Sequence, residues 1–267
     1  MTARTAATRG PAGGTVGREA GLREAGFREA MVAEWIKFTS VRSHRFTLAA
    51  FGILSAGVSI AVGAANGAQW AHASHNGYDP TNQALAGLAI GQLAIGVLGA
   101  LVITGEFSSG SIRSTLAAVP RRPRMLLAKA AVFWATALVA CEVITWLVFF
   151  AGQVASGPAP HATLGQPGVA RAILLTGAFL PLLGLFALGV GTLVRNSAGA
   201  IAIFVGFVFV VPLVLGPIHT SLSKYTPLNI EGSSVASTVG QPDISPWVGF
   251  GLMALYAAVV FAAGLVI

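Results

Sequence analysis

The stretch ALAGLAIGQLAIGVLGALVIT, from Ala84 to Thr104, has no charged side chain along its whole length. About 20 residues of helix, each rising 1.5 Å, cross the ~30 Å hydrocarbon core of a bilayer. Outward from this stretch, five others are similarly long and apolar: Phe46–Ala65, Ala128–Gln153, Ala172–Val194, Ala198–Gly216 and Val248–Ile267. Backbone groups in hydrocarbon need hydrogen-bond partners within their own segment, so such segments must be helices. The sequence predicts an all-α, polytopic membrane protein with six transmembrane helices.

Composition supports this fold class. Hydrophobic residues make up 55% of the 267 residues and charged residues only 9%, too few to cover the surface of a soluble domain of this size. The net charge of +7 raises the question of nucleic-acid binding, but most of the basic residues lie in a few segments before and between the spans. Eight precede the first span, five lie between spans two and three or at the start of span three, and one links spans four and five. Only Arg171 and Lys224 fall on the other side.

This asymmetry predicts the orientation. By the positive-inside rule, the N-terminus, the 105–127 loop and the C-terminus are cytoplasmic, and the loops 66–83, 155–171 and 217–247 lie outside. Topology, together with attraction to the anionic headgroups of the lipid bilayer, explains the basic excess, so we expect no nucleic-acid partner. We expect a multi-pass protein of the plasma (inner) membrane.

The chain divides into two regions. Residues 1–28 are of low complexity and end in a five-residue Arg-Glu-Ala repeat whose period matches no helix face, which predicts a disordered cytoplasmic tail. Residues 29–267 form the predicted transmembrane domain. Its start is amphipathic, with Val32, Trp35 and Ile36 on one face, and this pattern predicts a cytoplasmic N-terminal helix lying in the membrane interface.

Small residues recur inside the spans at spacings that let helices approach closely. They are Gly87, Gly91, Gly96 and Gly99 of span two, Gly177, Gly184, Gly189 and Gly191 of span four, and Gly199 and Gly206 of span five. Static packing accounts for these positions as well as a moving bundle does. Pro181 predicts a kink in span four. In the last outer loop, apolar residues such as Ile218, Leu222 and Ile230 predict short helices or re-entrant turns.

The sequence holds no enzyme motif. It has no phosphate-binding G-x-x-x-x-G-K-[ST] loop, and none of its three lysines follows a glycine, so the chain alone is not expected to bind ATP. His72 and His75 form an H-x-x-H pair without a third ligand nearby, which is more typical of a solvated loop than of a metal site. The lone Cys141 fits a packing role. We therefore predict no catalytic residue, cofactor or metal.

The most informative segment joins spans two and three. It reads TGEFSSGSIRSTL from Thr104 to Leu116 and continues through PRRPR to a lysine that opens span three. A Glu at the membrane exit, a Ser-capped amphipathic helix and a basic cluster predict a structured intracellular loop. Here the chain resembles the permease subunits of ABC-2-type ATP-binding-cassette transporters, in which span two ends in a Glu, a Gly follows, and a Pro–Arg turn leads to a Lys. The residues that match in order are Glu106, Gly110, Pro120, Arg122 and Lys129.

Two further motifs resemble the same family. Glu34-Trp35-x-Lys37 and Arg42-Ser43 look like its approach to span one, and Lys224-Tyr225-x-Pro227-x-Asn229 looks like the segment before span six. With the six-span layout, the likeness covers residues 30–267.

The resemblance implies a division of labour. A separate cytoplasmic ATP-binding subunit hydrolyses ATP, while the permease dimerises with a second copy or a paralogue and forms the translocation pathway, usually for export. The 106–124 loop then docks on the ATPase as a coupling helix. Its implied coupling residues are Glu106, Phe107, Gly110, Arg113, Pro120, Arg122 and Lys129. An ordinary positive-inside loop would explain the arginines but not Glu106 and Gly110.

Glu142 stands near the centre of span three. A carboxylate there costs several kcal/mol unless it is paired, hydrated or protonated, so Glu142 is a candidate functional residue. It could line the pathway, join a gating contact, or be a neutral acid bonded to a neighbouring helix. The rival functions are an ATPase-independent secondary transporter or channel, and a non-transporting subunit of a signalling or assembly complex. The sequence leaves the substrate, the direction of transport and the choice between homodimer and heterodimer open.

Overall fold

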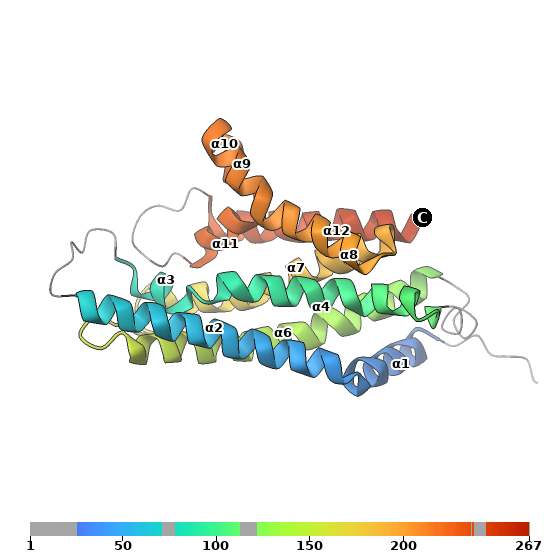
Figure 1. Cartoon of the computed structure of the whole chain (residues 1–267), viewed down its shortest axis with the longest axis horizontal. Coiled ribbons are helices and arrows are strands. Elements are labelled where there is room, and N and C mark those ends of the chain that lie inside the picture. Colours follow the sequence, from blue (N-terminus) through green and yellow to red (C-terminus); the bar gives the residue numbers. More distant parts are fainter. Residues whose placement is uncertain (1–25, 71–77, 113–121, 236, 238–243, 267) are drawn as a thin grey trace, which may run out of the picture.

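The computed structural model describes residues 26–70, 78–112, 122–235, 237 and 244–266, and within these residues every regular element is a helix (Figure 1). Six helical runs are long and apolar enough to cross a membrane: α2 (Arg42–Gln69), α4 (Leu88–Ser108), α6 (Arg122–Ala155), α7 (Val169–Val194), the composite run Ser197–Ile218, and α12 (Pro246–Val266). The shorter helices of the described residues are α1 (Phe27–Ser40), α3 (Pro80–Leu85), α10 (Thr220–Ser223) and α11 (Pro227–Val235). The prediction of an all-α protein with six apolar spans is confirmed.

The helix ends differ from the predicted span ends. α6 begins at Arg122 rather than Ala128, because an apolar stretch marks the membrane crossing and not the limit of helical hydrogen bonding. The second apolar stretch is split between two helices. Asp79 caps α3 by accepting a hydrogen bond from the backbone N–H of Thr81, and α4 starts anew at Leu88. Span two therefore begins later than predicted.

The fifth span is built from three consecutive segments: α8 (Ser197–Val205), the π-helical segment η1 (Gly206–Val210) and α9 (Val211–Ile218). A π-helical turn interrupts the regular hydrogen-bond ladder of a helix. Figure 1 shows α9 and α10 leaning away from the other helices. A side chain at Gly206 would meet no neighbouring atom within 4 Å, so the prediction that Gly206 serves close helix packing is wrong.

α7 forms the centre of the bundle. It packs against α4, α6 and α12 and is buried along most of its length, whereas α2 and α12 are mostly exposed. Glycines permit the closest approaches. A side chain at Gly99 of α4 would collide with the backbone of Gly184 on α7, and one at Gly91 would collide with Phe51 of α2. The predicted role of glycines in close packing is confirmed at these positions, and α7 stays helical through Pro181.

The segment between spans five and six contains α10 and α11, which confirms the prediction of short helices there. α11 packs against α7 and α12 and buries Ile230 and Glu231. Beyond it, the backbone N–H of Ser237 donates a hydrogen bond to Asp79 Oδ2 at 2.8 Å. This end of the bundle is therefore closed by contacts between segments that are distant in the sequence.

α1 lies at the opposite end of the bundle, which we call the α1 end. It starts at Phe27, inside the tail predicted for residues 1–28, of which residues 1–25 lie outside the described part. One extended residue, Val41, separates α1 from α2. The exposed face of α1 carries the three predicted apolar residues, Val32, Trp35 and Ile36, and its buried face carries Glu34. An apolar face turned away from the protein suits a helix at a membrane interface.

Candidate functional site

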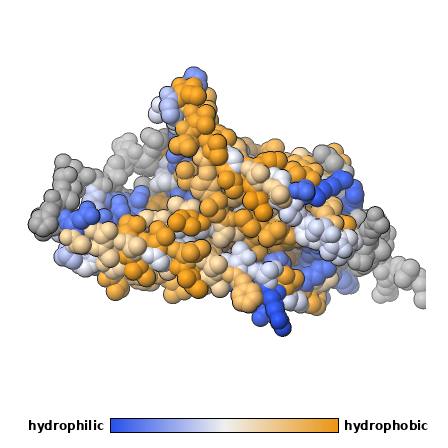
Figure 2. All heavy atoms as spheres, viewed as in Figure 1, coloured by the Kyte–Doolittle hydropathy of each residue, from blue (hydrophilic) through white to orange (hydrophobic). Residues whose placement is uncertain are grey.

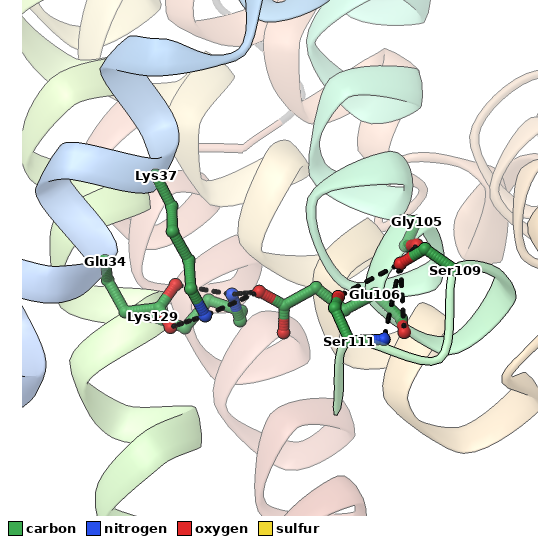
Figure 3. A network of polar contacts seen from close by, with 7 residues as sticks. All are labelled: Glu34, Lys37, Gly105, Glu106, Ser109, Ser111 and Lys129. Carbon is green, nitrogen blue, oxygen red and sulfur yellow. Dashed lines mark hydrogen bonds and ion pairs between the residues drawn. The ribbon is translucent and has the colours of Figure 1, made fainter. Parts of the chain in front are cut away.

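Four charged side chains meet at the α1 end, and we call them the charge cluster: Glu34, Lys37, Glu106 and Lys129 (Figure 3). Lys129 Nζ donates to Glu34 Oε2 at 2.5 Å and to Glu106 Oε1 at 3.0 Å. Lys37 Nζ donates to Glu34 Oε1 at 3.2 Å and to Glu106 Oε1 at 3.1 Å. Each lysine therefore bridges both carboxylates, and the cluster joins three helices.

Helix geometry explains why these residues meet. Glu34 and Lys37 are three residues apart on α1, so they project from the same face. Glu106 lies in the last turn of α4, and Lys129 lies about two turns into α6. Glu106 therefore lies just before the segment that joins α4 to α6, and Lys129 lies shortly after it.

Burial makes the charge cluster energetically demanding. The side chains of Lys129 and Glu34 are only 3% and 6% exposed, whereas that of Lys37 is 40% exposed. Removal of one partner from a buried ion pair costs about 3–5 kcal/mol, because an uncompensated charge stays buried. Within the described residues, Oε2 of Glu106 is buried and makes no hydrogen bond, so Glu106 is held through Oε1.

Lys37 occupies the solvent-facing edge of the charge cluster. Burial alone would lower the pKa of its ammonium group, but the negative charges of Glu34 and Glu106 outweigh burial and raise this pKa above its ordinary value of 10.5. Lys37 therefore remains a cation throughout the physiological pH range.

The predicted coupling residue Gly110 lies in the turn that follows α4, two residues after its last residue, Ser108. Its φ of +72° lies in the left-handed region that favours glycine, and its N–H donates to the carbonyl of Phe107 at 3.3 Å. Ser109 Oγ donates to the carbonyl of Gly105 at 2.8 Å and lies 3.0 Å from Ser111 Oγ (Figure 3). Glycine at position 110 therefore has a backbone reason, since any other residue would strain this turn.

The other predicted coupling residues have different surroundings. Phe107 is half-buried, and the Cζ atom of Arg195 lies 5.9 Å from its ring centroid, within reach of a cation–π contact. Arg122 is the first residue of α6. Arg113 and Pro120 lie outside the described residues, so the predicted coupling helix is described only at its two ends.

A cavity of 630 Å³ opens beside the charge cluster, between α1, the start of α2, the end of α4 and the start of α6. All four cluster residues line it. His44 and Ser109 add polar groups, and Val102 and Phe133 add apolar ones. The charge cluster is thus one wall of a recess at a junction of four helices.

Glu142 does not belong to the charge cluster. It lies 13 residues beyond Lys129 on α6, which is about 20 Å along the helix axis. Its carboxyl group packs over Gly177 of α7, where a side chain would collide with it. Within the described residues, its buried Oε2 atom makes no hydrogen bond. A glycine on α7 therefore provides the space that this carboxyl group occupies.

Sequence patterns do not identify Glu34 and Lys37 as site residues, because they mark these residues only as part of the motif before span one. A stronger signal was available, since Glu106 and Lys129 sit at the ends of apolar spans and need opposite charges. Glu34 and Lys37 share one face of a helix that enters the membrane at the same end, so they are the natural partners.

Comparison with known proteins adds no identification. A scan of the chain against models of protein families finds no match, and a search of curated proteins finds no match either. The likeness to ABC-2-type permeases therefore rests on the motifs and on the six-span layout.

Proposed function

We propose that the chain is the membrane-spanning permease subunit of an ABC-2-type ATP-binding-cassette transporter in the plasma membrane, with its N-terminus in the cytoplasm. The six apolar helices are compatible with a transporter subunit. The observation that carries the proposal is the charge cluster, because it ties α1 to the α4 and α6 ends between which the predicted coupling loop runs.

The charge cluster supports a mechanical role for this loop. A force applied to the loop reaches Glu106 at one end and Lys129 at the other, and both side chains bind Glu34 of α1 or its neighbour Lys37. Because separating these buried charges is costly, α1, α4 and α6 respond as one unit. Glu106 and Lys129 are therefore proposed as residues that pass a conformational change from the partner into the bundle.

The partners follow from the resemblance and from the missing phosphate-binding loop. A separate ATP-binding subunit supplies the energy, and a second permease copy or a paralogue completes the pathway. The bundle's few intramembrane charges suit an apolar or amphipathic substrate, and export is the proposed direction. Purified alone, the chain should show no ATP hydrolysis.

Two loop variants test the proposal. Glu106→Ala and Gly110→Pro should uncouple transport from ATP hydrolysis in the reconstituted complex while the protein still inserts into membranes. We expect transport per ATP hydrolysed to fall about tenfold, the scale of a typical coupling free energy of 1–3 kcal/mol. The matched control is Gly105→Ala, one residue before Glu106, where an added methyl group meets no atom within 4 Å; it should change neither insertion nor coupling. Wild-type coupling in both loop variants would reject the mechanism.

Glu142 favours a second candidate function. A half-buried carboxyl group that packs against α7, and whose buried Oε2 makes no hydrogen bond within the described residues, suits a proton-coupled secondary transporter that needs no ATPase. The two functions differ in the energy source. Uptake or efflux driven by a pH gradient in vesicles that contain only this chain, and lost in Glu142→Gln, would favour the second candidate.

A further inference from the structure

A groove runs along the outside of α2 and α6, starting at the α1 end. It has a volume of 820 Å³ and is lined by apolar and small side chains, among them Gly52 of α2 and Val139 of α6, with Trp35 of α1 at one end. On α6 its lining extends from Ala135 to Ile144, which is about 13 Å of helix. That length is close to the ~15 Å depth of one leaflet of the hydrocarbon core.

A basic recess of 550 Å³ adjoins the groove at the α1 end. Leu48 and Thr136 line both spaces, so the groove and the recess lie on the two sides of the same pair of side chains. Arg45 and His44 line the recess, and among the described residues no acidic side chain lines either space. Figure 2 shows hydrophilic atoms gathered where α1 meets α2, directly beside hydrophobic surface.

Arg45 is positioned by one contact. Its Nη2 donates to the carbonyl oxygen of Thr39 at 3.0 Å, near the end of α1, and the residue is exposed. A guanidinium carries five N–H donors in a planar fork that matches phosphate geometry. The hydrogen bond to Thr39 thus holds the fork in place and leaves donors for a ligand.

We propose that this groove and recess bind one anionic glycerophospholipid of the leaflet at the α1 end. The phosphate lies on Arg45 in the recess, and an acyl chain lies in the groove along Gly52 and Val139. The positive charge of Arg45 favours an anionic headgroup. The position of the groove on two membrane spans, α2 and α6, favours a hydrocarbon chain. This assignment does not depend on the presence of an ATPase partner.

The proposed lipid site lies next to the charge cluster, so lipid binding would affect the position of α1. Phe38 lines both the basic recess and the cavity beside the charge cluster. Phe38 is buried on the same face of α1 as Glu34, four residues away, whereas the adjacent Trp35 is exposed. A bound lipid would therefore hold α1 in the position in which the charge cluster is closed.

Native mass spectrometry of the delipidated full chain tests the proposal. The probes are phosphatidylglycerol and phosphatidylcholine with identical acyl chains, titrated into detergent solution. We expect phosphatidylglycerol to bind about fivefold more tightly, the effect of one arginine at an anionic membrane surface. A brominated-chain phosphatidylglycerol should quench Trp35 fluorescence, measured as the difference between the wild type and Trp35→Phe.

Four variants distinguish lipid binding at this site from general attraction of lipid to the protein. Arg45→Gln should remove the preference for phosphatidylglycerol and weaken phosphatidylcholine much less, since the choline cation offsets the phosphate charge of that lipid. Gly52→Leu should fill the groove and weaken both lipids, whereas Gly57→Leu, on an open and exposed part of the same helix, should weaken neither. Lys224→Gln removes one charge at the other end of the bundle and should change nothing.

Three results would overturn the proposal. Equal affinities of the wild type for the two lipids would, without any variant, show that there is no site specific for an anionic headgroup. An equal effect of Lys224→Gln and Arg45→Gln would show nonspecific attraction of lipid to a basic protein. A change in the monomer–dimer ratio in Gly52→Leu, with the lipid count unchanged, would assign the groove to a second copy of the chain.

Discussion

Lys129 is the most deeply buried member of the charge cluster and contacts both of its carboxylates. Lys129→Met keeps most of the side-chain length but removes the cation, so two carboxylates share the single charge of Lys37. We predict a loss of about 3–5 kcal/mol of stability. It should appear as a lower thermal midpoint of the protein in detergent. Lys37→Met should cost about 1 kcal/mol or less, since water already screens this exposed side chain.

A double variant tests whether these charges act together. Glu34→Gln combined with Lys129→Met leaves one acid and one base, Glu106 and Lys37, which stay 3.1 Å apart in the present geometry. We expect the double variant to be more stable than Lys129→Met alone, because the buried excess of negative charge is gone. Strict additivity of the two single effects would argue against a coupled charge cluster.

Glu231 provides a pH dependence outside the six spans. Burial raises the pKa of its carboxyl group to about 7, and the neighbouring Gln92 amide lowers it only in part. The folded protein therefore holds this proton more tightly than the unfolded chain, in which the pKa has its ordinary value of 4.5. Its contribution to stability is complete below pH 4.5 and is lost as the pH rises to about 7.

The variant Glu231→Gln tests this pH dependence because it resembles the protonated carboxyl group. It should remove most of a loss of about 3 kcal/mol between those two pH values. Thermal midpoints of the wild type and the variant, measured from pH 5 to pH 8, should converge at low pH and separate at high pH. Parallel curves would show that another group titrates.

At the scale of the helices, the features that are best predicted from the sequence are those that depend on composition alone. Each apolar stretch coincides with a helical run long and apolar enough to cross a membrane, because length and hydrophobicity decide whether a helix can cross a bilayer. The break between α3 and α4 was not predicted, because Asp79 and Pro80 start a helix inside the turn before span two. The π-helical η1 was not predicted either, since a register change in the backbone hydrogen bonds leaves no mark on the hydrophobic pattern.

The contact between α4 and α7 should be sensitive to a single methyl group. Gly99→Ala would place its Cβ against the backbone of Gly184, which cannot give way without moving the whole helix. We predict a loss of about 1–3 kcal/mol, the usual cost of overpacking. The matched control is Gly105→Ala on the same helix, where no atom lies within 4 Å, and it should be neutral or gain about 0.5–1 kcal/mol. Thermal unfolding of both variants in detergent would measure the difference.

At the scale of the whole molecule, the candidate site was only half predictable. Motifs at the ends of two spans predict Glu106 and Lys129, but no pattern in the sequence predicts which face of α1 meets them. In a soluble protein the apolar face of a helix points to the core. Next to a membrane that rule fails, because Trp35 and Ile36 can face lipid while Glu34 faces the bundle. The periodicity of α1 therefore shows that it has two faces and not which one binds the protein.

The orientation of the molecule gives the last prediction. Ser111 is exposed at the α1 end and His161 is exposed at the opposite end, after α6. Because basic residues gather at the α1 end, that end should be cytoplasmic. Cys141 is free and buried, so Ser111→Cys and His161→Cys are each introduced into a Cys141→Ala background. In intact cells a membrane-impermeant maleimide should label the His161→Cys variant, and the Ser111→Cys variant should react only after permeabilisation. Labelling of Ser111→Cys in intact cells would invert the topology and remove the predicted loop from the reach of any cytoplasmic ATPase.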